Sequence, residues 1–427
     1  MPQYELTAWL YGVEVAVIRE ARTRKLEIRY TDAARDRWAY GDPVLSVALP
    51  LNPEPRHPPS KVAPFLEGLL PEGDARTTLE SRFDVRRGDT LALLKAIGRD
   101  CAGAVVFQPH GDAPPPLRHQ RPDGITHAEV VAAIGALGTH PLGDDEHVRL
   151  SLAGQQEKLL LSRTPAGEWA RPIGAIPSTH ILKPELDGLE HLVANEAFCL
   201  RVARELGLTS ITVDELDADG RPVLVVSRYD RLVSADGQIT RVHQEDLCQA
   251  SSTPTAKKYE VDDGPSFRVV ADILDRAVGT ASDLDQLTRA MTLNVVVGNA
   301  DAHAKNYSLL HHPETGPTLA PLYDVASTIH SPTIETPEGT KKLSTALAMR
   351  INGREDINAI STDDLVAEAS SWPYGAPRAQ AVVQDLLERL PGAIARAVDR
   401  TPSVPEDLVE RVQHRVNALA SGRQVGD

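Results

Sequence analysis

The residues best suited to chemistry lie in the segment GNADAHAKN at 298–306. Within it, Asp301 and Asn306 have the D-x-x-x-x-N spacing of a kinase catalytic loop, whose Asp accepts a hydroxyl proton and whose Asn binds metal. Such a match alone is weak, but a predicted hairpin follows and Asp324 then stands where a second metal carboxylate is needed. Oxygen ligands of this kind suit Mg²⁺, which keeps waters and uses substrate phosphates. The pattern predicts ATP- and Mg²⁺-dependent phosphoryl transfer, with Asp301 as the base and Asn306 and Asp324 as metal ligands.

A lysine and a glutamate upstream fit the same chemistry. Lys183 lies in the predicted strand STHILKPE, and Glu196 lies among apolar residues of a predicted amphipathic helix that Gly207 ends. A strand lysine reaches nucleotide phosphates only if its direction is fixed, and a carboxylate on the next helix does this in protein kinases. Alternatively, Glu196 is a tolerated polar residue at the edge of the apolar face.

The loop AGQQEK at 153–158 separates two predicted strands, VRLSL and LLLSR, and is the candidate for covering the phosphates. It contains one glycine, Gly154, so it has neither a GxGxxG nor a GxxxxGK[ST] pattern. Lys158 would add a charge contact. Without the rest of the chain, a surface turn is an equally good interpretation.

A competing interpretation is a hydrolytic metal site built from Asp301, His303 and Asp324. No second histidine cluster with ligand spacing lies nearby. We expect His311 and His312 at the exposed tip of the hairpin.

These residues require a scaffold of strands followed by helices. Residues 1–125 are predicted to form an N-terminal α+β subdomain, 126–235 a kinase N-lobe-like part, and 236–427 a helical C-lobe with the catalytic loop. The elements expected to position the site are strands at 6–18, 25–30, 44–51 and 102–109, helices at 65–76, 90–98 and 189–208, a hairpin at 211–229, helices at 245–251, 269–278 and 284–298, a hairpin at 307–323, and helices within 362–420.

Composition limits the function further. The formal net charge of −15 argues against holding nucleic acid through bulk electrostatics. Three separated cysteines form neither a disulfide framework nor a CxxC metal site and suit a reducing cytoplasm. No signal peptide and no apolar run long enough for a membrane span are evident. We therefore expect a cytoplasmic protein with no membrane partner.

Eight segments occur in a characteristic order, with two more near the N-terminus. They are SLAGQQEKLLL, HILKPE, NEAFCLRVARELGL, SRYDR, HQEDLCQA, GNADAHAKNYSLL, PLYDVAST and LAMRING, preceded by FLEGLLPEGDAR and IGRDCAGAVVF. Over most of residues 1–355 the chain resembles the HipA family, the serine/threonine kinase toxins of type II toxin–antitoxin modules. The resemblance implies an α+β, bilobal protein-kinase-like fold with an N-terminal α+β subdomain and a mainly helical C-terminal lobe.

The resemblance also implies roles for individual residues. Asp301 matches the catalytic base and Glu196 the supporting helix carboxylate, while Asn306 and Asp324 match the Mg²⁺ ligands. The implied ATP-binding set is Ala153, Gly154, Gln155, Gln156, Glu157, Lys158, Lys183, Ser227, Arg228, Tyr229, His303, Lys305, Asn306, Tyr323 and Asp324. Ser151 matches the serine that members autophosphorylate, which expels the loop and silences the kinase; alternatively it is a strand residue with a satisfied hydroxyl.

The chain departs from the family at the hinge, where Ser227 begins SRYDR and the family typically has Glu-Arg-Phe-Asp-Arg. Hinge contacts to adenine are largely made by backbone, so this change puts affinity, not binding, in doubt. The segment at 250–268 resembles the family's substrate-side loop, and we assign no individual roles there.

The leading hypothesis is therefore a toxin kinase that phosphorylates a Ser or Thr of a cellular protein. In related toxins the target is glutamyl-tRNA synthetase, so translation arrest and persistence would follow. The implied partner is a HipB-like helix-turn-helix antitoxin, with operator DNA contacted only through it. The alternatives are a catalytically weak co-repressor scaffold and a small-molecule phosphotransferase.

Overall fold

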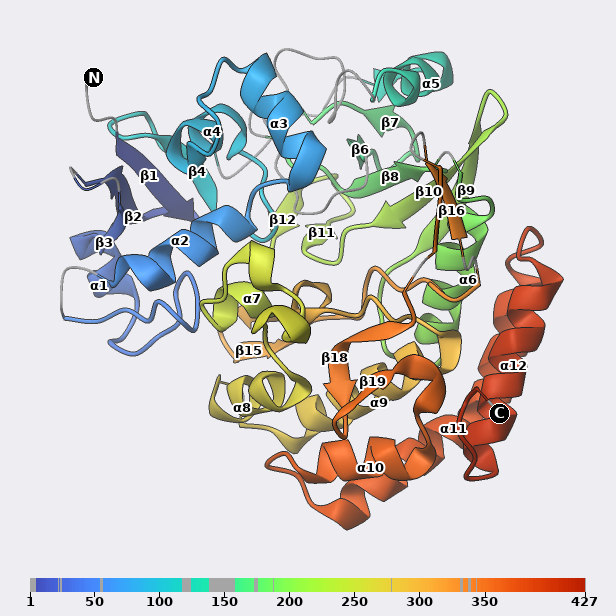
Figure 1. The fold of residues 1–427 in the computed structure, drawn as a ribbon. Coiled ribbons are helices and arrows are strands. Elements are labelled where there is room, and N and C mark those ends of the chain that lie inside the picture. The colour runs from blue at the N-terminus through green and yellow to red at the C-terminus, as the bar shows by residue number, and fades with distance from the viewer. Residues whose placement is uncertain are drawn as a thin grey trace. The chain divides into compact units, whose positions relative to one another are not determined.

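A computed structural model describes most of the 427-residue chain, and the chain divides into two compact units. The described residues are 5–21, 23, 25–53, 57–116, 124–137, 158–172, 176–186, 188–277, 279–330, 333–336, 339–342 and 344–426. The first unit comprises Met1–Lys183, Ser227–Ala256 and Leu310–Pro313, and the second comprises Pro184–Val226, Lys257–Leu309 and Glu314–Asp427. Figure 1 shows the elements of both units.

The first unit is built on strands and short helices. Its elements are β1 (Glu5–Leu10), β2 (Val13–Glu20), β3 (Leu26–Tyr30), α1 (Asp32–Arg37), α2 (Pro59–Gly68), α3 (Gly73–Arg82), α4 (Thr90–Ile97), β4 (Val106–Pro109), β5 (Gly124–Ile125), α5 (His127–Gly135), β6 (Leu159–Arg163), β7 (Trp169–Ala170), β8 (His180–Pro184, across the boundary), β11 (Arg231–Val233), β12 (Ile239–Arg241), β13 (His243–Asp246), α7 (Leu247–Ala250) and η1 (Thr255–Lys257, likewise). An antiparallel sheet has the order β3-β2-β1-β4, and β5, β7, β6 and β8 follow one another in a second sheet.

The hydrophobic core of this unit lies where the first sheet meets α2 and α4. Leu6 and Ile18 from the strands, Phe65 from α2 and Leu94 from α4 are all fully buried in it. Burying a side chain of this size contributes about 1.5–3 kcal/mol. The predicted strands at 6–18 and 25–30 and the helix that Gly98 ends are confirmed.

The predicted strand at 44–51 is wrong, because this apolar segment is a buried loop. Some of its backbone polar groups bond to nearby backbone and others to side chains of β13, instead of to a neighbouring strand. The carbonyl of Leu45 accepts from the His243 ring at 2.8 Å, and Val47 donates to Glu245 at 2.7 Å. These two partners lie far along the chain in β13 and satisfy groups that a strand would have paired.

The second unit is mainly helical. Its elements are α6 (Leu192–Glu205), β9 (Val213–Ala218), β10 (Arg221–Ser227, across the boundary), η2 (Glu260–Asp262), α8 (Phe267–Ala277), α9 (Ala281–Val297), η3 (Ala304–Asn306), β14 (Ser308–His312, likewise across the boundary), β15 (Gly316–Leu319), β16 (Thr333–Thr336), β17 (Gly339–Lys342), β18 (Ala346–Ile351), β19 (Arg354–Asp356), η4 (Ile357–Ala359), α10 (Thr362–Ser370), α11 (Ala376–Asp399) and α12 (Glu406–Ala420). The helix α11 packs against α6, α9, α10 and α12. The predicted hairpins β9–β10 and β14–β15 and the C-terminal helices are confirmed.

The helix α9 is the central support of the second unit. Its residues from Leu284 onward are mostly buried, and Leu293 and Val296 are fully enclosed. The hydroxyl groups of Thr288 and Thr292 bond to carbonyls one turn earlier, at 2.8 Å, so these polar side chains are satisfied inside the core. A helix enclosed in this way gives a rigid base for the loop that follows it.

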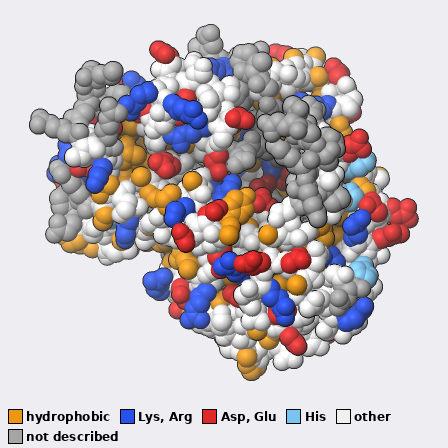
Figure 2. All heavy atoms as spheres, in the orientation of Figure 1, with side chains coloured by type: hydrophobic (Ala, Val, Ile, Leu, Met, Phe, Trp, Pro, Cys, Tyr) orange, Lys and Arg blue, Asp and Glu red, His pale blue; other side chains and the backbone are white. Residues whose placement is uncertain are grey.

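In the described part of the chain, no helix combines the length and the apolarity that crossing a membrane requires. On the face shown in Figure 2, Lys and Arg side chains are scattered among Asp and Glu.

Candidate active site

The loop that carries Asp301 begins where α9 ends, at Gly298. This residue has φ +75°, and a side chain there would collide with the side chain of Ile329. Glycine is therefore required for both backbone conformation and space. Thr328 holds the loop from the other side: its N–H donates to the Gly298 carbonyl at 2.9 Å, and its hydroxyl accepts from the Ala300 N–H at 3.0 Å.

Asp301 and Asn306 are joined through the loop backbone. The Asn306 side-chain amide donates to the carbonyl of Asp301 at 3.2 Å, and the His303 N–H donates to the same carbonyl at 2.7 Å. The Asp301 side chain is exposed, whereas Asn306 is buried in η3. The loop thus fixes the backbone of the acid while its carboxylate faces solvent.

Asp324 is held in an unusual backbone conformation, with φ +56°. A non-glycine residue in the left-handed region carries strain that the surrounding structure must support, and such residues gather at functional sites. Its neighbour Tyr323 provides part of that support, since its hydroxyl donates to the carbonyl of Lys305 at 2.6 Å and lies 2.6 Å from the Ser308 hydroxyl. The segment around Asp324 is thereby tied to the catalytic loop.

His303 lies within the field of the charged groups of the site. Burial lowers the pKa of His303 and Lys258 acts in the same direction, while Asp301 and Asp324 oppose the shift. The structure therefore brings together His303 and both predicted acids. Among the described residues, no three His, Cys, Asp or Glu side chains are grouped as a metal ion would need, so the hydrolytic site of Asp301, His303 and Asp324 has no support there.

His311 contradicts the prediction of an exposed hairpin tip. It lies within β14 rather than at the turn, is buried, and its Nε2 is 2.9 Å from Glu245 Oε1. The glutamate lies in the same unit. His312 is half-buried.

The hinge residues of the first unit are organised by a buried charge cluster, which we define as Asp100, Arg228, Asp230, Arg231 and Arg241. The Arg228 guanidinium donates to both oxygens of Asp230, at 3.0 and 2.8 Å. Asp100 accepts from Arg231 at 2.8 Å and lies 3.4 Å from Arg241. The side chain of Arg228 is therefore used inside the protein, and its backbone N–H donates to the carbonyl of Thr179 at 2.8 Å.

This charge cluster shifts the titration of its members. Burial works against charge on Asp100, but Arg231, Arg228 and Arg241 outweigh it and hold the pKa of Asp100 well below its ordinary value. Burial likewise opposes charge on Arg228, yet Asp230 and Asp100 raise its pKa. From the sequence we predicted Arg228 as a nucleotide contact. No pattern in the sequence indicated that Asp100 would form an ion pair with it.

The remaining predicted residues lie on several elements. Lys183 is buried on β8, Glu196 is buried on α6, Ser227 ends β10, and Lys305 is buried in η3. Tyr229 contacts Gln244 through its hydroxyl. Lys158 is half-buried just before β6. The predicted positions that lie outside the described residues are Ser151, Ala153, Gly154, Gln155, Gln156 and Glu157.

Two residues near Asp301 were not assigned a role from the sequence. The Tyr259 hydroxyl donates to Asp301 Oδ1 at 2.8 Å, and the Lys258 ammonium lies 5.7 Å from the centre of the Tyr259 ring. Both belong to the segment 250–268, whose residues have no distinctive spacing to the catalytic loop. Only the tertiary contact reveals them.

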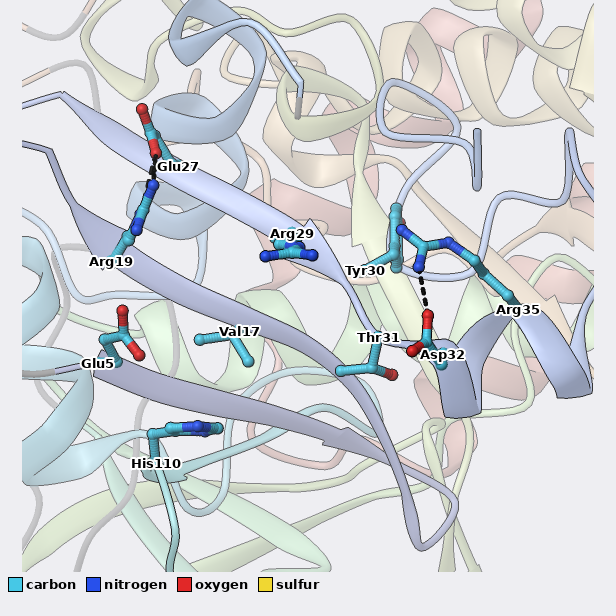
Figure 3. A pocket seen from close by; sticks show the side chains of 10 residues that line it. All are labelled: Glu5, Val17, Arg19, Glu27, Arg29, Tyr30, Thr31, Asp32, Arg35 and His110. Carbon is cyan, nitrogen blue, oxygen red and sulfur yellow. Dashed lines mark hydrogen bonds and ion pairs between the residues drawn. The ribbon is translucent and has the colours of Figure 1, made fainter. Parts of the chain in front are cut away.

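A separate open pocket of about 340 Å³ lies on the outer face of the N-terminal sheet (Figure 3). Two ion pairs lie in it: Arg19 is 3.0 Å from Glu27, and Arg35 is 2.6 Å from Asp32. The pocket contains none of the predicted catalytic residues.

The comparisons with known proteins agree with one another. The model of the HipA-like C-terminal domain matches residues 150–394, and the model of the HipA N-terminal domain matches residues 6–108. A putative kinase, Y4mE, of Sinorhizobium fredii is 36% identical over 422 residues, covering 97% of this chain and 96% of its own. The serine/threonine-protein kinase toxin HipA of Shewanella oneidensis is 32% identical over 370 residues, covering 83% of this chain and 81% of its own.

A solved structure gives the same result for the fold. The HipA chain matched comes from a complex of Shewanella oneidensis HipA, HipB and operator DNA. It superposes with a TM-score of 0.80 at 28% identity, covering 97% of this chain and 96% of that one.

Proposed function

Since the chain belongs to the HipA family of serine/threonine kinase toxins, we propose that it transfers the γ-phosphoryl group of ATP, with Mg²⁺, to a protein Ser or Thr. The observation that carries the proposal is the anchored loop in which Asn306 bonds to the backbone of the exposed Asp301. Asp324, in its left-handed conformation, is tied to that loop through Tyr323.

The donor set fits Mg²⁺. Asn306 donates through its amide nitrogen, which leaves the amide oxygen for a cation, and Asp324 adds an exposed carboxylate. Mg²⁺ usually takes only one or two ligands from the protein and completes its coordination with waters and substrate phosphates. Two protein oxygens are therefore sufficient. When bound, Mg²⁺ would neutralise charge on the phosphates.

The chain's own residues have separate tasks in the proposed reaction. Asp301 accepts the proton of the attacking hydroxyl, while Lys183 binds phosphate oxygens. The backbone at Ser227–Tyr229 would receive the adenine through groups other than those of Arg228 that are already bonded, which are its side chain, on Asp230, and its N–H, on Thr179. The loop of Ala153–Lys158 would cover the phosphates, and Glu196 would orient Lys183.

We further propose the regulation and partners that the family suggests. Ser151 would be the autophosphorylated residue whose modification silences the kinase. A HipB-like antitoxin would bind the chain and supply the contact with operator DNA, as HipB and DNA are present in the matched Shewanella complex. The protein target would be a translation component such as an aminoacyl-tRNA synthetase, and the reaction would take place in the cytoplasm.

The test is labelling with [γ-³²P]ATP. The purified chain should label itself in the presence of Mg²⁺, and neither EDTA-treated protein nor Asp301→Asn should do so. Asp301 is exposed, so the variant is expected to fold, and its melting temperature provides the control. Mass spectrometry should then find phosphate on Ser151. The proposed transfer is refuted if neither the chain nor any protein of a cell extract is labelled.

A further inference from the structure

We propose that Tyr259 is a positioning residue for the catalytic base. Its hydroxyl donates to Oδ1 of Asp301 at 2.8 Å and so leaves Oδ2 for the hydroxyl of the protein substrate. The inference rests on the proposed function, because it takes Asp301 as the base.

The contact matters because Asp301 is exposed. The terminal torsion of an aspartate is broad, so an exposed carboxylate rotates unless a neighbour holds it. The loop bonds described above hold the backbone of Asp301, through its carbonyl, and do not restrain this rotation. A donor on one carboxylate oxygen selects the orientation in which the other oxygen faces the substrate.

The ring of Tyr259 contacts two neighbouring side chains. Its ring meets the ring of His303 edge-on, with centroids 5.3 Å apart and an interplanar angle of 80°. The Lys258 ammonium lies 5.7 Å from the ring centroid, within the range of cation–π attraction. The hydroxyl is therefore aimed by its ring contacts and does not depend on the bond to Asp301 alone.

The loop that carries Tyr259 is closed on itself. The carbonyl of Tyr259 accepts from Asp262 at 3.0 Å and from Gly264 at 2.9 Å. A side chain at Gly264 would collide with the carbonyl oxygens of Lys257 and Tyr259, so glycine allows the turn to close tightly. This closure restrains the residue that holds the base.

A second element anchors the same loop. Glu260, the residue after Tyr259, accepts a hydrogen bond from the backbone N–H of Arg350 on β18 at 2.7 Å. The Arg350 guanidinium also lies 3.7 Å from the Glu260 carboxylate. A tyrosine on an anchored loop is suited to hold a group in place, whereas a tyrosine that substrate must displace would need a loop free to move.

In the reaction, the substrate hydroxyl oxygen attacks the γ-phosphorus of ATP and gives its proton to Oδ2 of Asp301. The new O–P bond forms as the bond from the γ-phosphorus to the bridging oxygen breaks, and ADP leaves with that electron pair. Tyr259 neither gains nor loses a proton. Its part is to keep the accepting oxygen within hydrogen-bond reach of the attacking hydroxyl, where a small misplacement slows the reaction strongly.

The experiment compares Tyr259→Phe with Tyr374→Phe. The control removes another tyrosine hydroxyl that donates to an aspartate, Asp285, in the same unit and away from the catalytic loop. Self-labelling with [γ-³²P]ATP is followed over a range of ATP concentrations. For Tyr259→Phe we expect the rate at saturating ATP to fall about tenfold, with the half-saturating ATP concentration changed less than twofold. For Tyr374→Phe we expect an unchanged rate.

Every other outcome overturns the inference. An unchanged rate in Tyr259→Phe, with active wild type and inactive Asp301→Asn, removes the positioning role and leaves the proposed function intact. A faster rate would mean that Tyr259 blocks access of the substrate to Asp301. Phosphotyrosine at position 259 would mean that Tyr259 is a phosphorylation site. A parallel rise in half-saturating ATP, or a lowered melting temperature, would show general disruption of the site. Unlabelled wild type would refute the proposed function and the inference with it.

Discussion

Replacing Asp100 with asparagine tests whether the buried charge cluster stabilises the first unit. Asp100 accepts the N–H and the hydroxyl of Ser178, at 2.8 and 2.7 Å, as well as the Arg231 guanidinium. The side chains of Asp100, Arg228 and Arg231 are almost fully buried. The variant keeps the shape of the side chain but leaves three arginines facing Asp230 alone.

The expected loss is large. Removing one partner of a buried ion pair costs about 3–5 kcal/mol, because the remaining charge is uncompensated. For a unit of this size, 1 kcal/mol corresponds to roughly 2–4 °C. Asp100→Asn should therefore lower the melting temperature of the first unit by roughly 6–20 °C.

The loss also has a defined pH dependence. The pKa of Asp100 is depressed in the folded protein, so its contribution is complete above the unfolded value near 4 and disappears as the pH falls toward the folded value. The difference between wild type and Asp100→Asn should thus be constant around neutral pH and shrink below about pH 4.

Tryptophan fluorescence during urea unfolding measures this, since Trp9, Trp38 and Trp169 lie in the first unit and only Trp372 lies in the second. Asp36→Asn makes the same chemical change at an exposed position of that unit and should alter stability by less than about 0.5 kcal/mol. A loss below about 1 kcal/mol in Asp100→Asn would refute the reasoning, because the arginines would then be adequately solvated without it.

Three further predictions concern the second unit and β13. Gly298→Ala should destabilise the protein by about 1–3 kcal/mol and slow labelling, because φ is +75° and the new methyl meets Ile329; unchanged melting would contradict this. Asp324→Asn should reduce labelling at least about 100-fold with melting within about 2 °C, and labelling near the wild-type rate would exclude the proposed metal ligand. His243, buried, has its pKa lowered to about 3, so stability should fall by about 1 kcal/mol per unit as the pH drops below about 6.5. In urea unfolding of His243→Gln, the free energy of unfolding should lack this dependence on pH. An equal dependence in the variant would mean that another group causes it.

Much of the scaffold is predictable from the sequence because it depends on local patterns. Alternation of apolar residues indicated the first strands, and apolar residues at helical spacing followed by Gly298 indicated α9 and its end. The spacing of Asp301 and Asn306 is set by a short loop, so it remains meaningful without the fold. The same local reasoning failed at 44–51, where apolar alternation resembled a strand although its hydrogen-bond partners are the side chains of His243 and Glu245.

Taken by itself, the sequence predicted the catalytic acids and their order, most of the elements that carry them and the family to which the chain belongs, since each depends on residues close together or on recognisable segments. The tertiary structure alone decided three things: that Tyr259 contacts Asp301 across 42 positions, that Asp100 joins Arg228, and that His311 is buried against Glu245. The physical reason is that a hydrogen bond or ion pair between distant segments depends on how the chain packs. The spacing of residues along the sequence does not predict such a contact. The predicted catalytic base was therefore visible in the sequence, and the tyrosine that donates a hydrogen bond to it was not.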